Sequence, residues 1–132
     1  IRYLTFEKLF NDGDPIPDFA VADLSFISLK IVLPCIKSLL NDTFSELLVL
    51  VKPQFEVGKN KVGKGGVVRD HSLQLEAIEG VVNESEKFGW YPRGIIPSPL
   101  KGPAGNQEYL LWMDDDDTTK EIKNFEKMIN FL

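Results

Sequence analysis

The sequence predicts an α/β fold: a mostly parallel sheet with one antiparallel strand and helices on both faces. Two observations lead to this prediction. Short apolar runs alternate with longer segments whose apolar residues recur at helical spacing, and this order is typical of a parallel sheet with crossover helices. The last two apolar runs are separated by about ten residues without a helical pattern, as expected for an antiparallel pair.

The first half of the chain contains two predicted strands and one helix. Phe19–Leu24 is a short apolar run after a turn rich in Pro, Gly and Asp, which indicates a buried strand. A helical pattern runs from Leu29 to Leu40, and we expect Pro34 to lie in its first turn or to bend it. Leu47–Val51 is continuously apolar, which is typical of a parallel strand covered on both faces.

The second half predicts one more helix and two strands. The apolar periodicity of Ser72–Phe88 indicates a helix that ends at Gly89. Trp90–Pro97 is a predicted strand, and Pro92 places it near an edge of the sheet because proline donates no backbone hydrogen bond. The last strand is predicted over Glu108–Met113.

The predicted elements continue beyond this strand. The acidic run Asp114–Asp117 is interpreted as a solvated turn, and Thr118 with Glu121 forms a capping box for a final helix. The apolar face of that helix would carry Ile122, Phe125, Ile129 and Leu132. Three parallel strands followed by one reversed strand are typical of the second half of a Rossmann-like methyltransferase domain, whose glycine-rich cofactor turn would lie outside this chain.

The composition is that of one globular domain. The chain has 132 residues, of which 43% are hydrophobic and 27% charged, with a net charge of -5. Its single cysteine, Cys35, permits no disulfide framework and suggests an intracellular protein. With one cysteine and one histidine, His71, we expect no zinc site. The longest apolar run, Leu47–Val51, is too short to span a membrane, and no signal peptide is visible.

The segment Lys52–Asp70 is a 19-residue predicted loop with a concentration of basic side chains. Its GKNKVGKG stretch resembles a phosphate-binding P-loop but has Gly65 where that motif needs Ser or Thr, and it lacks the flanking strand and helix, so we reject that reading. A local basic patch on an acidic domain suits a polyanion, whereas the alternative is a solvated loop. The basic residues are Lys52, Lys59, Lys61, Lys64 and Arg69.

Three polar residues flank the predicted strands. Asp23 closes the first strand, Lys52 closes the second, and Glu108 opens the reversed last strand. Because the last strand runs the other way, its start lies at the same rim as the carboxyl ends of the other strands, where open α/β sheets bind ligands. We therefore expect an acid, a lysine and a second acid to meet at one edge.

Three longer motifs carry a family resemblance. VADLSFISLKIVLP, LVKPQFEVGKNKVGKGGVVRDH and SPLKGPAGNQEYLLW resemble the hemolysin-A-type (TlyA) family, a branch of the FtsJ-like S-adenosylmethionine-dependent RNA methyltransferases. The resemblance covers nearly all of residues 1–113. It implies a partial catalytic domain over residues 1–132, with the cofactor-binding glycine turn and an S4-type RNA-binding domain lying upstream of this chain. Alone, this portion would be inactive.

The resemblance also implies site residues. The family carries a Lys-Asp-Lys-Glu set for ribose 2′-O-methylation, in which Asp23, Lys52 and Glu108 match the last three members. Asp23 and Leu24 would contact S-adenosylmethionine. A 2′-hydroxyl is a poor nucleophile, and a lysine can act as its base only when neutral. We expect Lys52 to contact the hydroxyl, Asp23 to orient Lys52, and Glu108 to orient the lysines or a water.

The implied partner is ribosomal RNA or a ribosomal subunit in the cytoplasm. The basic loop would lie over the site and meet RNA phosphates through Lys59, Lys61, Lys64 and Arg69. Two alternatives stay open: a non-catalytic RNA-binding module, and the haemolytic or pore-forming activity that the family name suggests. The unpaired edge of the first strand would be covered either by the rest of the domain or by a homodimer.

Overall fold

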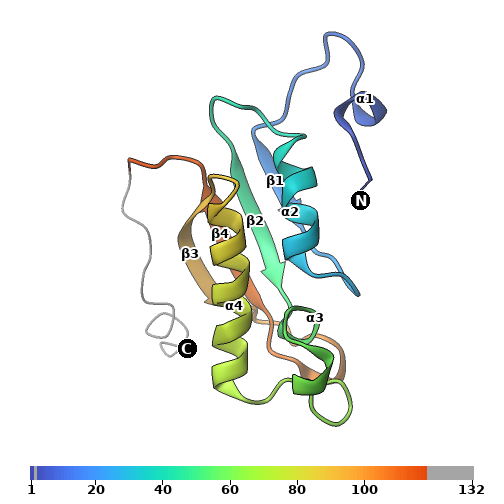
Figure 1. The fold of residues 1–132 in the computed structure, drawn as a ribbon, viewed down its shortest axis with the longest axis vertical. Helices are drawn as coiled ribbons and strands as arrows, with labels where there is room; N and C mark the ends of the chain where they lie inside the picture. Colours follow the sequence, from blue (N-terminus) through green and yellow to red (C-terminus); the bar gives the residue numbers. More distant parts are fainter. Residues whose placement is uncertain (2, 119–132) are drawn as a thin grey trace.

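The computed structural model describes residue 1 and residues 3–118 as a single four-stranded sheet with helices packed on it (Figure 1). A one-turn helix, α1 (Phe6–Leu9), precedes the sheet. The strands are β1 (Phe19–Ala22), β2 (Glu46–Val51), β3 (Tyr91–Pro97) and β4 (Tyr109–Asp114), arranged in the order β1-β2-β4-β3. The predicted strands are all present, each with ends displaced by one or two residues.

The last strand is reversed and lies inside the sheet. β1 and β2 pair in parallel, whereas β4 pairs antiparallel with both β2 and β3. β1, β2 and β3 therefore point the same way, which confirms the predicted directions. Because β4 is inserted between β2 and β3, the sheet has only one hydrogen-bonded parallel pair.

Two long helices cover one face of the sheet. α2 (Leu29–Lys37) and α4 (His71–Glu86) lie side by side in front of it (Figure 1). Both crossovers step across the sheet in the same direction, and because such crossovers are right-handed they place their helices on the same face. Helices were predicted on both faces of the sheet, but among the described residues α2 and α4 lie on the same face. The core between helices and sheet includes Val32, Leu33, Val49, Ile78 and Leu111.

The opposite face of the sheet is largely apolar and open. Residues of β2 alternate between full and partial burial, which means that only one face of this strand is fully covered. The prediction that Leu47–Val51 is covered on both faces is therefore wrong. Phe19, Val21, Ile96 and Trp112 are exposed. β1 also forms a free edge of the sheet. Dimerisation through that edge stays a prediction.

Local signals explain the helix ends. Ser28 caps α2 by accepting a hydrogen bond from the backbone of Lys30, and Asp70 caps α4 through the backbone of Ser72. Gly89 adopts a φ of 81° after α4, which confirms the predicted stop. Pro34 lies in the interior of α2 and not in its first turn; the helix ends three residues later.

The predicted loop between β2 and α4 is ordered. It contains α3 (Pro53–Glu56) and a short 3₁₀ helix, η1 (Lys59–Lys61). Val57 and Val68 are buried against Ala77 of α4 in a small second core. The sequence did not indicate these contacts, because one buried valine at position 57 and an adjacent pair at 67–68 give no periodic signal.

The first two residues of the predicted solvated turn Asp114–Asp117 hold the sheet instead, whereas Asp117 is exposed and lies in a turn as expected. Asp114 is buried and pairs with Arg93 at 2.7 Å. Asp115 pairs with Lys37 at 2.7 Å and accepts hydrogen bonds from the backbone and hydroxyl of Ser45. Basic partners on α2 and β3, distant in sequence, explain the difference. The predicted helix that follows Thr118 lies outside the described residues.

Candidate active site at the carboxyl end of the sheet

Strand pairing brings the three predicted site residues to one rim. Asp23 directly follows β1 and Lys52 directly follows β2, and these strands run in parallel. Glu108 directly precedes β4, whose first residue, Tyr109, pairs with Val51. All three therefore stand at the end of the sheet that carries α3 in Figure 1.

Lys52 and Asp23 are in direct contact. Lys52 Nζ lies 2.6 Å from Asp23 Oδ1 and donates a hydrogen bond of 3.0 Å to Ser25 Oγ. Lys52 is buried, with only 8% of its surface exposed, whereas the Asp23 side chain is 66% exposed. Among the described residues, Asp23 and Ser25 are the polar side chains that contact this amine. The pair thus presents a fixed amine beside an accessible carboxylate.

Glu108 belongs to the same rim but has different contacts. Its Oε1 accepts a hydrogen bond of 3.1 Å from Gln54 Nε2, and Gln54 follows Lys52 by two residues. Within residues 3–118, Glu108 forms no ion pair with Lys52, whose ionic partner is Asp23. Glu108 is 5% exposed and packs closely against Gly102, where any β-carbon would collide with its carboxylate. The backbone of Gly102 therefore fixes where this carboxylate lies.

Two cavities open beside this rim. One, of about 370 Å³, has mostly apolar walls and reaches Asp23 and Leu24 along the free edge of β1. The other, of about 330 Å³, is lined by Ser25 and Gln54 together with residues of the glycine loop. The two acidic residues face different surroundings, because Asp23 lines the first cavity and Gln54, the partner of Glu108, lines the second.

Buried polar groups hold the loops around the site. Asn106 is 2% exposed; its Oδ1 accepts from the backbone of Val68, and its Nδ2 donates to the carbonyls of Gly66 and Pro103. It therefore ties the glycine loop to the connection between β3 and β4, which includes the 3₁₀ turn η2 (Pro103–Gly105). Such a fully bonded buried amide stiffens both loops.

A second link joins α3 to α2. Glu56 accepts hydrogen bonds from the Ser28 hydroxyl at 2.6 Å and from the backbone of Leu29 at 2.7 Å. Burial raises the pKa of the Glu56 carboxyl, although these hydrogen bonds and the nearby charge of Lys30 oppose the rise. The carboxylate lies at the N-terminus of α2, where the helix dipole favours negative charge.

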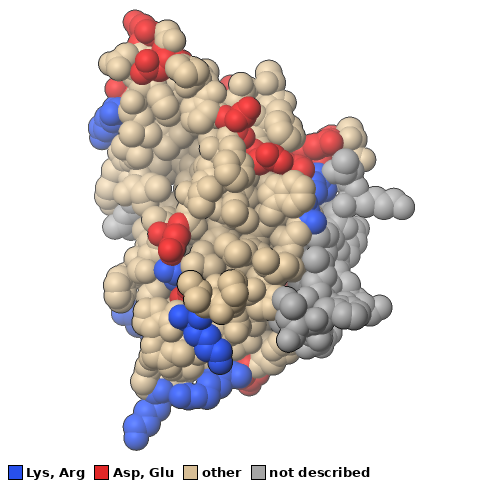
Figure 2. Space-filling model, turned by 180° about the vertical axis from the view of Figure 1, so that it is seen from behind, with Lys and Arg blue, Asp and Glu red and all other residues tan. Residues whose placement is uncertain are grey.

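The predicted basic residues do not all behave alike. Lys61 pairs with Glu76 of α4 at 2.6 Å, so its charge is compensated in this structure. No ion pair or side-chain hydrogen bond within the described residues engages Lys59, Lys64 or Arg69. Figure 2 shows basic side chains gathered at the end of the molecule that carries the rim, while acidic ones gather at the opposite end. This gradient matches the predicted polarity of the loop.

Several site residues were not predicted from the sequence. Ser25 and Gln54 contact the lysine and the second acid, and Asn106 and Gly102 shape the surrounding loops. All four lie in the motifs that carry the family resemblance, which is the only signal that could have indicated them. No cluster of three or more metal-ligating side chains occurs in the described part of the chain. Across those same residues, no helix is long and apolar enough to cross a membrane.

Comparison with known proteins assigns the family. The family model described as "FtsJ-like methyltransferase" matches residues 1–115. The 16S/23S rRNA (cytidine-2′-O)-methyltransferase TlyA of Mycobacterium tuberculosis is 48% identical over 73% of this chain and 35% of its own length. Hemolysin A of Brachyspira hyodysenteriae is 36% identical over 79% of this chain and 42% of its own length.

Solved structures agree with this assignment. A protein described as a "putative hemolysin" from Lactococcus lactis superimposes with a TM-score of 0.87 at 33% identity, over 98% of this chain and 61% of that one. The chain spans between 35% and 42% of the length of the two curated relatives named above. The chain belongs to the FtsJ-like methyltransferase family, in its TlyA branch.

Proposed function

We propose that the full-length protein transfers a methyl group from S-adenosylmethionine to a ribose 2′-hydroxyl of ribosomal RNA. The observation that carries this proposal is the buried amine of Lys52, fixed by Asp23 and Ser25 at the carboxyl end of the sheet. Relatives named as rRNA (cytidine-2′-O)-methyltransferases support a cytidine as the target nucleotide. Such a substrate would place the protein in the cytoplasm.

The residues of the first cavity fit one side of a cofactor site. S-adenosylmethionine supplies an electrophilic methyl group on a positively charged sulfur. The exposed carboxylate of Asp23 stands beside the apolar walls of the cavity along β1. An acid suits a cationic ligand and its hydroxyl groups, and apolar walls suit a purine ring. Asp23 and Leu24 are therefore our candidates for cofactor contacts.

Lys52 is the residue that we place on the substrate hydroxyl. Its amine already contacts Asp23 and Ser25, so its position is set before RNA arrives, and we place the ribose hydroxyl beside the same nitrogen. Asp23 acts through Lys52 by holding it. Glu108 contacts Gln54 in this structure, so we propose that it orders that side of the rim or a water.

The basic end of the molecule supplies the RNA surface. Lys59, Lys64 and Arg69 are exposed cations without ion-pair partners among residues 3–118, and they lie near the rim. We assign them to RNA phosphates, since exposed cations account for most sequence-independent affinity for nucleic acid. Lys61 would contribute less, because it must exchange Glu76 for a phosphate.

A methyl-transfer assay tests the proposal. Full-length protein, S-adenosylmethionine and unmethylated ribosomal RNA should yield a 2′-O-methylated nucleotide, detected by mass spectrometry of nuclease digests. A methylated base without a methylated ribose would contradict the assigned chemistry. Specific RNA binding with no transfer would instead favour the non-catalytic RNA-binding alternative.

A further inference from the structure

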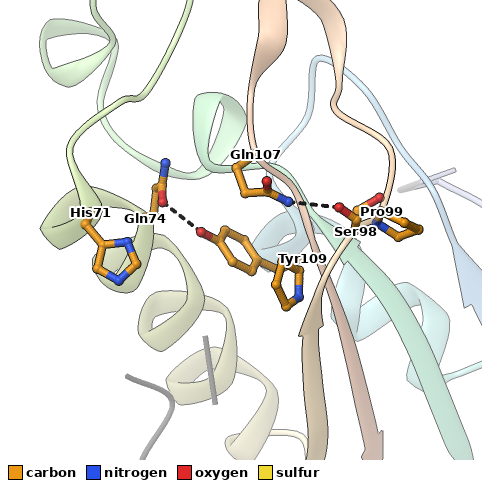
Figure 3. A pocket seen from close by; sticks show the side chains of 7 residues that line it. His71, Gln74, Ser98, Pro99, Gln107 and Tyr109 are labelled. Atoms are coloured by element: carbon orange, nitrogen blue, oxygen red, sulfur yellow. Dashed lines mark hydrogen bonds between the residues drawn. The ribbon is translucent and has the colours of Figure 1, made fainter. Parts of the chain in front are cut away.

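A third cavity lies on the other side of the β3–β4 connection from Glu108. It has a volume of about 460 Å³, within the range of about 300–1,000 Å³ typical of small-ligand pockets. His71 and Gln74 reach it from the first turn of α4, and Ser98, Pro99 and Gln107 line it from the opposite side, with Tyr109 between them (Figure 3). A neighbouring cavity of about 400 Å³ shares Gln74 and Gln107 with it. We refer to these two adjoining cavities together as the groove.

The ends of this groove differ in character. One end has an apolar wall that includes Pro97 and Pro99. The other end is lined by Arg69 and Lys101, which come from two different loops. Both cations are exposed, and neither forms an ion pair within residues 3–118. Two cations that line the same cavity and have no ion-pair partner among the described residues suit a phosphate.

The groove is rigid, with one free acceptor at its centre. Gln74 is buried and fully bonded, because it donates to the carbonyl of Val68 and accepts from the Tyr109 hydroxyl at 2.7 Å. Gln107 Nε2 donates to the carbonyls of Ser98 and Glu108, each at 3.0 Å. These two contacts identify the amide nitrogen, so the Gln107 amide oxygen is the group left without a protein donor among the described residues.

We propose that this groove binds one nucleotide of the RNA substrate next to the methylated one. The phosphate would lie between Arg69 and Lys101, the base would lie against Pro97 and Pro99, and Gln107 would accept a hydrogen bond from an amine or hydroxyl of the nucleotide. This inference rests on the proposed function for the identity of the RNA. Its position fits, since Gln107 lines the groove and the next residue, Glu108, lies at the rim in contact with Gln54.

Paired variants of the full-length protein test the groove. Arg69→Gln with Lys101→Gln should raise the dissociation constant for ribosomal RNA and the KM for RNA about tenfold, since charge-assisted phosphate contacts are lost. The slope of log affinity against log salt should fall by about 1. The matched control, Lys8→Gln with Lys87→Gln, changes the net charge equally on exposed residues of α1 and the far end of α4, and should leave all three values unchanged.

A second variant tests the groove without removing a cation. Gln107→Glu places a carboxylate near the phosphate position but also removes the hydrogen bonds donated to Ser98 and Glu108, so thermal unfolding is measured beside binding; with a wild-type Tm, it should weaken RNA binding about tenfold. RNA carrying 4-thiouridine beside the target should crosslink to the peptide that contains Pro97 to Tyr109. Cytidine 5′-monophosphate should compete with RNA; binding without competition would indicate a site for free nucleotides and overturn the proposal.

The outcomes separate this inference from the proposed function. Wild-type affinity and salt slope in both groove variants, or crosslinks only outside the groove, would overturn the inference even if methyl transfer proceeds. Groove-dependent RNA binding by a protein that transfers no methyl would leave the inference standing and remove the proposed activity.

Discussion

Gly102→Ala is the most specific perturbation of the second acid. A β-carbon at this position would lie 2.5 Å from Glu108 Cδ and closer still to its Oε1, whereas ordinary van der Waals contact begins at about 3.4 Å. The backbone at Gly102 has φ -70° and ψ -178°, which alanine adopts without strain. The substitution therefore acts on the Glu108 carboxylate, which must move by about 1 Å.

The expected consequences for stability and activity differ in size. The displaced carboxylate loses the hydrogen bond from Gln54, which costs about 1 kcal/mol of unfolding free energy. A displacement of about 1 Å in a group that orders the reacting centre lowers the rate by about 100-fold. We therefore expect kcat for methyl transfer to fall by about 100-fold, while the affinity for S-adenosylmethionine and the Tm change little.

The assay compares three variants by radiolabelled methyl transfer, calorimetric cofactor binding and thermal unfolding. Glu108→Gln should reproduce the loss of activity because it removes the charge and keeps the shape. Gly80→Ala lies inside α4 with its nearest neighbour, Lys30 Nζ, at 3.5 Å, so it should leave activity intact and stabilise the fold by about 0.5–1 kcal/mol. Wild-type kcat in a folded Gly102→Ala protein would show that the position of Glu108 does not matter to the reaction.

Two further predictions concern charge. Burial alone would raise the pKa of Asp115, but hydrogen bonds from Lys37 and Ser45 and the charge of Lys37 hold that pKa below its usual value. The stabilisation is therefore present at neutral pH and is lost as the pH falls through the lowered pKa. Asp115→Asn should lower the free energy of unfolding by about 2 kcal/mol at pH 7 and by progressively less in acid, as measured by urea unfolding. A loss that does not depend on pH would contradict a contribution from the Asp115 charge. Lys59→Gln with Lys64→Gln should lower the slope of log RNA affinity against log salt by up to about 2. Lys61→Gln should change this slope less, because Lys61 pairs with Glu76. Equal effects of the three lysines would show that the Lys61–Glu76 ion pair does not persist.

The sequence was sufficient to place the strands and the rim. The strand ends determine which polar residues stand at the ligand-binding end. Two apolar strands end at Ala22 and Val51, and the reversed strand begins after Glu108. These features depend on periodicity and chain direction, which are local properties. Asp23 and Lys52 are in contact as expected, whereas Glu108 contacts Gln54, because side-chain partners depend on loop packing that periodicity does not describe.

Long-range polar contacts account for what the sequence did not reveal. The acidic residues after β4 resembled a solvated turn until Arg93 and Lys37 were placed beside them. The glycine-rich segment resembled an open loop, although Asn106 and buried valines anchor it. The uncovered face of the sheet could not be anticipated either, since right-handed crossovers place α2 and α4 together only for the observed strand order, which periodicity does not reveal.

The central claim is that the buried amine of Lys52 acts on the substrate hydroxyl. Lys52→Met keeps most of the apolar stem and removes the amine, and the partner it leaves behind, Asp23, is 66% exposed and can be solvated. Measured on the full-length protein with ribosomal RNA, this variant should lose methyl transfer by about 10²–10⁴-fold while binding S-adenosylmethionine and RNA as the wild type does. Undiminished transfer, or a parallel loss of cofactor affinity, would contradict the role given to Lys52.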